Sequence, residues 1–131
     1  PLMDRIDIQI EVPAVLFTEL ADKEKGEVSE IVRQRVQFAR KIQLDRYNLK
    51  DGIFANSQME SNDLRKYCKL ESKSANLLKT AMEKLGLSAR AYDRILKVSR
   101  TIADLDEQKQ IQSNHISEAI QYRSLDRKLW L

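Results

Sequence analysis

A row of cations along one predicted helix offers the clearest chemistry in this chain. Residues 87–105 read Leu-Ser-Ala-Arg-Ala-Tyr-Asp-Arg-Ile-Leu-Lys-Val-Ser-Arg-Thr-Ile-Ala-Asp-Leu. A rotation of about 100° per residue places four polar side chains on one stripe, namely Arg90, Arg94, Lys97 and Thr101. Cations held rigidly on a helix are suited to bind phosphate oxygens. The alternative is a solvated flank whose aliphatic stems cover the edge of the core. A further arginine, Arg100, extends this basic cluster.

Other chemistry finds little support in the sequence. The three glycines, Gly26, Gly52 and Gly86, are too far apart to form a glycine-rich phosphate-binding loop. One histidine and one cysteine cannot make a structural zinc site. We expect Cys68 to be a buried structural residue and His115 to be a surface or helix-capping residue. On its own, the chain is therefore not expected to be an enzyme.

Composition is typical of a globular, helix-rich protein. The 131 residues are 42% hydrophobic and 33% charged, enough for one domain or one domain with a small appendage. The net charge of +3 permits an anionic partner but does not require one. A single cysteine favours a reducing compartment, and no apolar run is long enough to span a membrane. Because the chain begins at Pro1 without an initiator methionine, we expect a fragment of a longer polypeptide.

Hydrophobic periodicity predicts the elements that position the basic row. Along residues 87–105 one apolar face comprises Ala91, Ile95, Val98, Ile102 and Leu105. Ser88 is a suitable N-cap for this helix, and Gly86 is suited to end the helix before it in a left-handed conformation. Further helices are predicted over residues 28–47, over 62–68 after Ser61, over 72–85, and after Ser113.

A different pattern marks the start of the chain. Residues 6–12 alternate between apolar and polar side chains, which predicts a half-buried strand ended by Pro13. A lone strand cannot form a sheet, so either its partner strand lies outside this chain or the segment is left without a partner in the fragment. Arg5 precedes the strand and could pair with Asp4 or Asp7, a surface interaction worth at most about 1 kcal/mol.

Three side chains do not fit the patterns around them. Arg35 and Arg46 fall within the apolar stripe of residues 28–47, so they either extend to its margins or meet a partner that the fragment lacks. Phe54 lies in a polar loop, residues 48–60, and we expect its ring to be tucked beneath it.

Three segments of the chain resemble a known family. Residues 1–7, Pro-Leu-Met-Asp-Arg-Ile-Asp, are similar to the P-L-L-D-R-[IF]-D segment of the ComM/YifB-like group of AAA+ ATPases, which carry a magnesium-chelatase C-terminal domain. Residues 87–96 resemble the L-S-A-R-A-Y-x-R-I-L segment of that group, and residues 118–123 resemble its closing E-A-[IL]-Q-Y-R. The resemblance covers nearly the whole chain. The departures are the tail after Arg127 and the missing ATPase core.

This resemblance implies a mainly α fold, a helical bundle that forms an AAA+ lid, preceded by one β-strand left from the α/β ATPase core. The implied organisation runs in four parts: residues 1–13 as the last strand of the AAA+ core, 14–27 as a linker, 28–123 as the helical lid and 124–131 as a tail.

The resemblance also implies roles for individual residues. Arg5 matches the arginine finger, which reaches the γ-phosphate of ATP in the neighbouring subunit. Arg90 matches the sensor 2 arginine, which contacts the phosphates from the lid of its own subunit, and Arg94 is a secondary candidate. ATP and Mg²⁺ are expected in the full-length parent, with none bound to the fragment. The implied partners are the N-terminal AAA+ core of the same polypeptide, further copies in a homo-hexamer, and DNA, all in the cytoplasm and with no membrane.

Three functions follow as alternatives. The resemblance favours the lid of a ComM-like DNA helicase that drives branch migration during natural transformation. A free-standing helical module could instead bind the DNA backbone through the same basic stripe. The third alternative is the lid of a magnesium-chelatase motor subunit in tetrapyrrole biosynthesis.

Overall fold

The computed structural model describes residues 2–21, 26–48 and 52–123, and the fold over these residues is mainly helical. The elements in chain order are η1 (Met3–Arg5), α1 (Phe17–Ala21), α2 (Ser29–Arg46), η2 (Asn56–Gln58), α3 (Ser61–Tyr67), α4 (Ser72–Leu85), α5 (Ala89–Leu105) and α6 (Ser113–Gln121). The described part contains no β-strand, only an isolated parallel bridge between Leu70 and Ile111. The predicted helical bundle is therefore confirmed.

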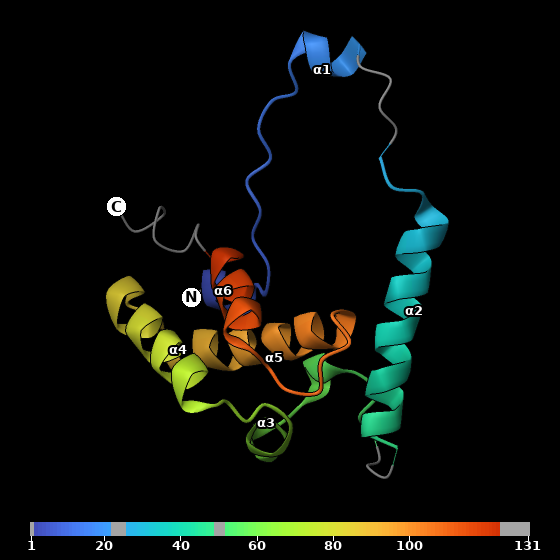
Figure 1. Cartoon of the computed structure of the whole chain (residues 1–131). Coiled ribbons are helices and arrows are strands. Elements are labelled where there is room, and N and C mark those ends of the chain that lie inside the picture. The colour runs from blue at the N-terminus through green and yellow to red at the C-terminus, as the bar shows by residue number, and fades with distance from the viewer. Residues whose placement is uncertain (1, 22–25, 49–51, 124–131) are drawn as a thin grey trace.

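Helix α5 is the centre of the bundle. It crosses the middle of the molecule and contacts α2, α3, α6, η1 and η2 (Figure 1). The Ser88 hydroxyl accepts a hydrogen bond from the backbone N–H of Ala91 at 3.2 Å, as expected of an N-cap. Ala91 and Ile95 are fully buried, and Val98 and Ile102 pack against the core while partly buried. Leu105, the last residue of the predicted apolar face, is 44% exposed, so the prediction is wrong at that end of the helix. Because α5 is held from several sides, side chains on its remaining surface have a rigid base.

Helices α4 and α6 flank α5 and contact each other. Gly86 ends α4 in the left-handed conformation, at φ 60° and ψ 40°, as the sequence predicts. The hydroxyls of Ser74 and Ser113 lie 3.1 Å apart and join the starts of α4 and α6.

Two of the predicted N-caps are displaced by one residue. Ser61 and Ser113 are the first residues of α3 and α6, not the caps that precede them. In each helix the side chain three residues after the cap reaches back to the cap's backbone N–H. Asp63 accepts from Glu60 at 2.9 Å, and the Nδ1 atom of His115 accepts from Gln112 at 2.9 Å. These return hydrogen bonds fix the start of each helix one residue earlier than the serine suggested.

The alternating segment at residues 6–12 does not form a strand within the described part of the chain. It is irregular and mostly exposed, with Val12 80% accessible. One backbone hydrogen bond ties it to the bundle, from the N–H of Gln9 to the carbonyl of Tyr122 at 2.7 Å. A strand needs a neighbouring strand to satisfy its backbone groups, and no described segment provides one. The segment leads away to α1, which stands apart from the bundle (Figure 1).

Helix α2 forms as predicted, but much of its apolar face is uncovered. Val32, Val36 and Phe38 are 39%, 46% and 47% exposed, and only Ala39 and Gln43 of this helix are buried. The helix therefore contacts the bundle mainly through its C-terminal half, which Figure 1 shows beside α5. The expectation for Phe54 is wrong: its ring is 58% exposed, while the neighbouring Ile53 is buried in its place.

The limits of the four predicted parts stay predictions. Residues 124–131, the predicted tail, lie outside the described residues. In the described part, no helix has the length and apolar character needed to cross a membrane.

Candidate functional site

Arg90 occupies the first turn of α5 and is exposed. It forms no ion pair with any residue that the structure describes. The N-terminus of a helix carries a partial positive charge, so a cation there is unfavourable by about 0.3 to 1 kcal/mol. Arg90 thus contributes nothing evident to stability. Together with the helix N-terminus, however, its guanidinium creates a positive potential that an anion would neutralise.

The secondary candidate, Arg94, is engaged by a carboxylate. Its Nη1 atom lies 2.5 Å from Oδ1 of Asp7, and both side chains are partly exposed. This contact joins α5 to the N-terminal segment across 87 positions of sequence. A surface ion pair of this kind stabilises by at most about 1 kcal/mol, so a stronger anion could displace Asp7.

A second arginine fastens the N-terminal segment from the other side. Arg123 is buried and donates from Nη1 to the carbonyl of Ile6 at 2.6 Å and from Nη2 to that of Met3 at 3.1 Å. Hydrogen bonds from a charged donor are stronger than neutral ones. The N-terminal segment is therefore held against the bundle at two places, by the pair of Asp7 with Arg94 of α5 and by Arg123, which follows α6.

Arg5 lies at the end of η1 and is exposed. The alternative to a functional role, in which Arg5 pairs with Asp4 or Asp7, is not found, and Asp7 binds Arg94 instead. Within the described residues Arg5 forms no ion pair at all. Since η1 contacts α5, the structure brings the segment of Arg5 and the helix of Arg90 into one body, which local sequence patterns did not predict.

Arg100 does not belong to the exposed basic cluster, contrary to the expectation from the sequence. It is 3% exposed and donates to Asp104 Oδ1 at 3.2 Å, to the carbonyl of Lys109 at 2.9 Å and to that of Gln108 at 2.7 Å. Burial lowers the pKa of Arg100, and repulsion from Arg46 adds to this against the attraction of Asp104. Of the four cations in the predicted basic cluster, only Arg90 and Lys97 have no carboxylate partner among the described residues. Lys97 donates a hydrogen bond to the carbonyl of Ser57.

A buried polar network that joins α2 to α5 was not predicted from the sequence patterns. Asp104, 1% exposed, receives Arg46 in a bidentate contact of 2.5 and 2.9 Å. Asn56 donates from Nδ2 to Asp104 at 2.9 Å and accepts from Arg46 at 3.0 Å. Burial pushes the pKa of Arg46 down, but the hydrogen bond and charge of Asp104 outweigh it and the pKa is raised.

Two signals could have revealed this network. One was Arg46 itself, a cation inside an apolar stripe, for which we expected a margin position or a partner outside the fragment. The partner, Asp104, instead lies within the chain. The other was Asp104, which lies four residues after Arg100 and so on the same side of α5. Arg35, the other unusual cation, pairs with Glu27 on the surface at 2.8 Å.

Cys68 and His115 are structural. Burial raises the pKa of the Cys68 thiol to about 11, so it holds its proton at neutral pH and is a poor nucleophile. The His115 ring is 1% exposed. Its Nδ1 atom accepts from Gln112, so Nε2 carries the proton that is donated to Asp106 Oδ2 at 2.8 Å. Both nitrogens of the ring are therefore used in holding the start of α6.

The described residues offer no group of three or more His, Cys, Asp or Glu that could hold a metal ion. None of these described residues is therefore assigned to Mg²⁺. What the site can supply is donor groups for an anion, and the exposed guanidinium of Arg90 fits the acceptor oxygens of a phosphate.

These features describe a helical accessory domain that presents arginines from a rigid central helix. Comparison with protein families gives a specific match: residues 26–123 match the family described as "Magnesium chelatase, subunit ChlI C-terminal". The chain belongs to this family.

The chain is also similar to longer curated proteins. It is 44% identical over 130 residues to the competence protein ComM of Haemophilus influenzae, and 41% identical over 133 residues to the uncharacterized protein YifB of Escherichia coli. Each alignment covers 98% of this chain but 25% of the relative. The chain therefore spans about a quarter of the length of the relatives it matches. The similarity to ComM and YifB agrees with the resemblance found in the sequence motifs.

Proposed function

We propose that this chain is the C-terminal lid of a hexameric AAA+ ATPase, in which Arg90 is the sensor 2 arginine that binds the ATP phosphates of its own subunit. The observation that carries the proposal is the state of Arg90. It is exposed on the first turn of the most firmly packed helix and has no carboxylate partner among the described residues. An exposed arginine without a carboxylate partner can donate to a ligand, and the buried residues of the same turn fix the position of its backbone.

The geometry suits stabilisation of developing charge. When ATP is bound in the parent, it supplies the phosphoryl group that is transferred. Arg90 would donate hydrogen bonds to the phosphate oxygens, where negative charge is redistributed in the transition state. Ala91 and Ile95, both fully buried, anchor the turn that carries it. Little conformational freedom of the backbone would then be lost when the contact forms.

Arg5 is proposed as the arginine finger that acts on the neighbouring subunit. The segment that carries Arg5 is fixed to the bundle by the pair of Asp7 with Arg94 of α5 and by Arg123 after α6, so a rotation of the lid would move Arg5 as well. An arginine finger contributes a factor of about 10³ to 10⁵ in turnover. Such a linkage would couple the state of one nucleotide site to the arginine that serves the next.

We further propose that the parent is a cytoplasmic DNA helicase of the ComM kind. The support is the 44% identity to a protein named for competence. The proposed partner of this chain is the ATPase core of the same polypeptide. The exposed apolar side chains of Ile10, Val12 and Phe17 are suited to be covered by it, because so much apolar surface is rarely left to solvent.

The test uses the full-length parent with single substitutions. Arg90→Ala and Arg5→Ala should each lower ATP turnover at least about 100-fold. Arg65→Ala is the matched control, because Arg65 is an exposed arginine on α3 away from η1 and the first turn of α5, and it should retain normal turnover. Normal turnover in Arg90→Ala would contradict the proposed role.

A mixing experiment separates action within a subunit from action on its neighbour. Arg5→Ala subunits would be mixed with subunits that retain Arg5 but carry an inactivated ATP site. If Arg5 acts on the neighbouring subunit, the mixture regains turnover that neither preparation has alone. If turnover stays at the sum of the two separate preparations, Arg5 does not act in this way.

A further inference from the structure

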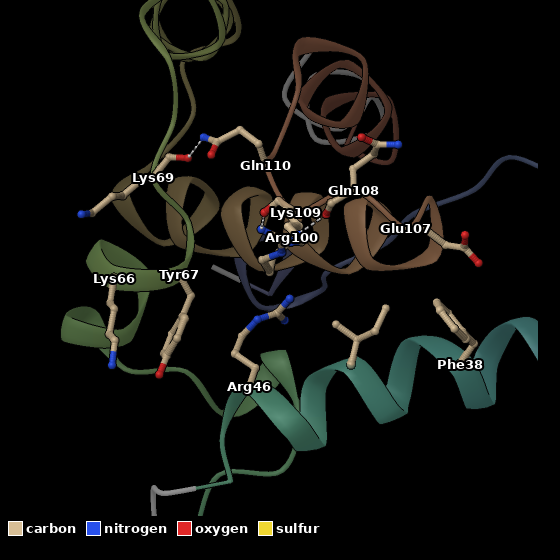
Figure 2. A pocket seen from close by; sticks show the side chains of 11 residues that line it. Phe38, Arg46, Lys66, Tyr67, Lys69, Arg100, Glu107, Gln108, Lys109 and Gln110 are labelled. Carbon is tan, nitrogen blue, oxygen red and sulfur yellow. Dashed lines mark hydrogen bonds between the residues drawn. The ribbon is translucent and has the colours of Figure 1, made fainter.

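A basic pocket lies on a side of the bundle that the proposed ATP contact does not use. It has a volume of about 480 Å³ and is bordered by the end of α2, by α3 and by the loop after α5 (Figure 2). Arg100, which borders it, lies ten positions along α5 from Arg90, a separation of about 15 Å at 1.5 Å per residue. The pocket is therefore distinct from the exposed arginine at the first turn.

Positive charge is concentrated around this pocket. Its cationic side chains are Arg46, Lys66, Lys69, Arg100 and Lys109, while its lining contains a single carboxylate, Glu107. Beneath them, the buried carboxylate of Asp104 neutralises only one of the two guanidiniums that it binds. The whole chain has a net charge of only +3, so a large part of its basic excess gathers here.

The cations around the pocket are of two kinds. Asp104 holds Arg46 and Arg100 in place, so they form a fixed positive floor. Figure 2 shows both arginines at the pocket. The side chains of Arg46 and Arg100 are only 14% and 4% exposed, so they contribute their positive charge to the pocket and not direct contacts with a ligand. The lysines are exposed and can follow an anion that enters. A rigid floor with mobile donors at the rim is suited to a chain of phosphates.

Two aromatic rings border the same pocket. Tyr67, on α3, packs edge-on against Tyr47 with ring centroids 5.3 Å apart, and the Lys66 ammonium lies 5.0 Å from its ring centroid. Phe38 projects from α2 on another side of the pocket and is 47% exposed (Figure 2). Aromatic faces beside cations fit nucleobases, which stack on rings while their phosphates meet the charges. An acidic peptide would use the cations but would have no need of the rings.

We infer that this pocket binds single-stranded nucleic acid, with phosphates on the lysine rim and a base against Phe38. The site is separate from the contact proposed for Arg90 and requires no nucleotide. The inference rests on the charge, the donors and the rings around the pocket.

The experiment measures binding of this chain to a fluorescent oligothymidylate of about 20 nucleotides by anisotropy, in a series of salt concentrations and without ATP. The test variant is Lys66→Ala/Lys69→Ala/Lys109→Ala. All three lysines are exposed, so their removal should leave the fold intact, which circular dichroism checks. The matched control removes three exposed lysines from α4, in the variant Lys73→Ala/Lys79→Ala/Lys84→Ala.

Counterion release sets the expected size of the effect. Each phosphate contact on a single strand contributes about 0.7 to the slope of log affinity against log salt, so three lost contacts reduce the slope by about 2. At about 0.1 M salt this corresponds to a loss of about 100-fold in affinity for the test variant. Phe38→Leu, which keeps an apolar side chain but removes the ring, should weaken binding at least about fivefold.

Three outcomes would overturn the inference. The first is no binding by the unaltered chain at low salt. The second is an equal loss in the α4 control, which would show that only total charge matters. The third is competition by polyglutamate at the same charge concentration as effectively as by oligothymidylate, together with unchanged binding in Phe38→Leu, which would identify an acidic protein segment as the ligand.

Discussion

The buried carboxylate of Asp104 gives the sharpest prediction about stability. Asp104→Asn keeps the size and shape of the side chain but removes its charge, leaving Arg46 and Arg100 without a counter-ion. Asp104 is 1% exposed, and the side chains of Arg100 and Arg46 are 4% and 14% exposed. Solvent can therefore replace little of the lost interaction.

The magnitude follows from this burial. Removing one partner of a buried ion pair costs about 3 to 5 kcal/mol, because the remaining charge stays desolvated. The amide oxygen of Asn still accepts hydrogen bonds while its NH₂ group replaces the other acceptor oxygen, so we expect a loss of about 3 kcal/mol, at the lower end of this range. This is a large fraction of the roughly 5 to 15 kcal/mol by which a domain is stable. Because the network joins α2 to α5, α2 should lose its attachment first.

The assay is urea denaturation followed by circular dichroism, with the free energy of unfolding obtained by linear extrapolation. Asp7→Asn is the matched control. It removes the same charge from the exposed pair with Arg94 and should cost less than about 1 kcal/mol. If Asp104→Asn unfolds within about 0.5 kcal/mol of the unaltered chain, the buried network does not hold α2 as argued.

Two further predictions concern single residues of the bundle. Burial raises the pKa of the Cys68 thiol from 9.0 to about 11, so the folded state favours the protonated thiol. The stability that this thiol contributes is full below about pH 9 and is lost as the pH rises towards 11. Stability should fall by about 2 to 3 kcal/mol over that range, and by less in Cys68→Ala, as measured by urea denaturation at each pH. Tyr47, whose pKa burial raises to about 12, remains in both proteins. Gly86→Ala should cost about 1 kcal/mol in the same assay, because φ is +60° there although no atom would clash with the added Cβ, and an unchanged stability would contradict this.

Local patterns in the sequence predicted the helices well. The apolar periodicity of residues 87–105, with Ser88 before it, predicted the central helix, and Gly86 predicted the end of α4. These signals depend on interactions within a few residues, so they survive without knowledge of the rest of the fold.

Sequence patterns could not show whether another segment covers the apolar face of a helix or strand. The apolar stripe of residues 28–47 predicted α2 but not that Val32 and Val36 would remain exposed. The alternation of residues 6–12 indicates a strand only where a neighbouring strand exists, and the described residues provide none. Both errors have the same physical cause, because periodicity reports a preference for burial and not the presence of a partner.

Contacts distant in sequence decided the roles of the arginines. Arg94 met Asp7 across 87 positions, and Arg46 met Asp104 across 58, which no local spacing can indicate. Arg100 became buried because Asp104 and two loop carbonyls satisfy it, and the loop bends there through Glu107 at φ 58°. The exposure of Arg90, by contrast, agrees with its place on the predicted stripe.

The most direct test of the central claim is the position of the Arg90 side chain in the full-length parent bound to a non-hydrolysable ATP analogue. If the lid senses nucleotide through this residue, a nitrogen of its guanidinium lies within about 3 Å of a phosphate oxygen. If the side chain instead points to solvent or binds a carboxylate while the nucleotide is in place, the claim is contradicted.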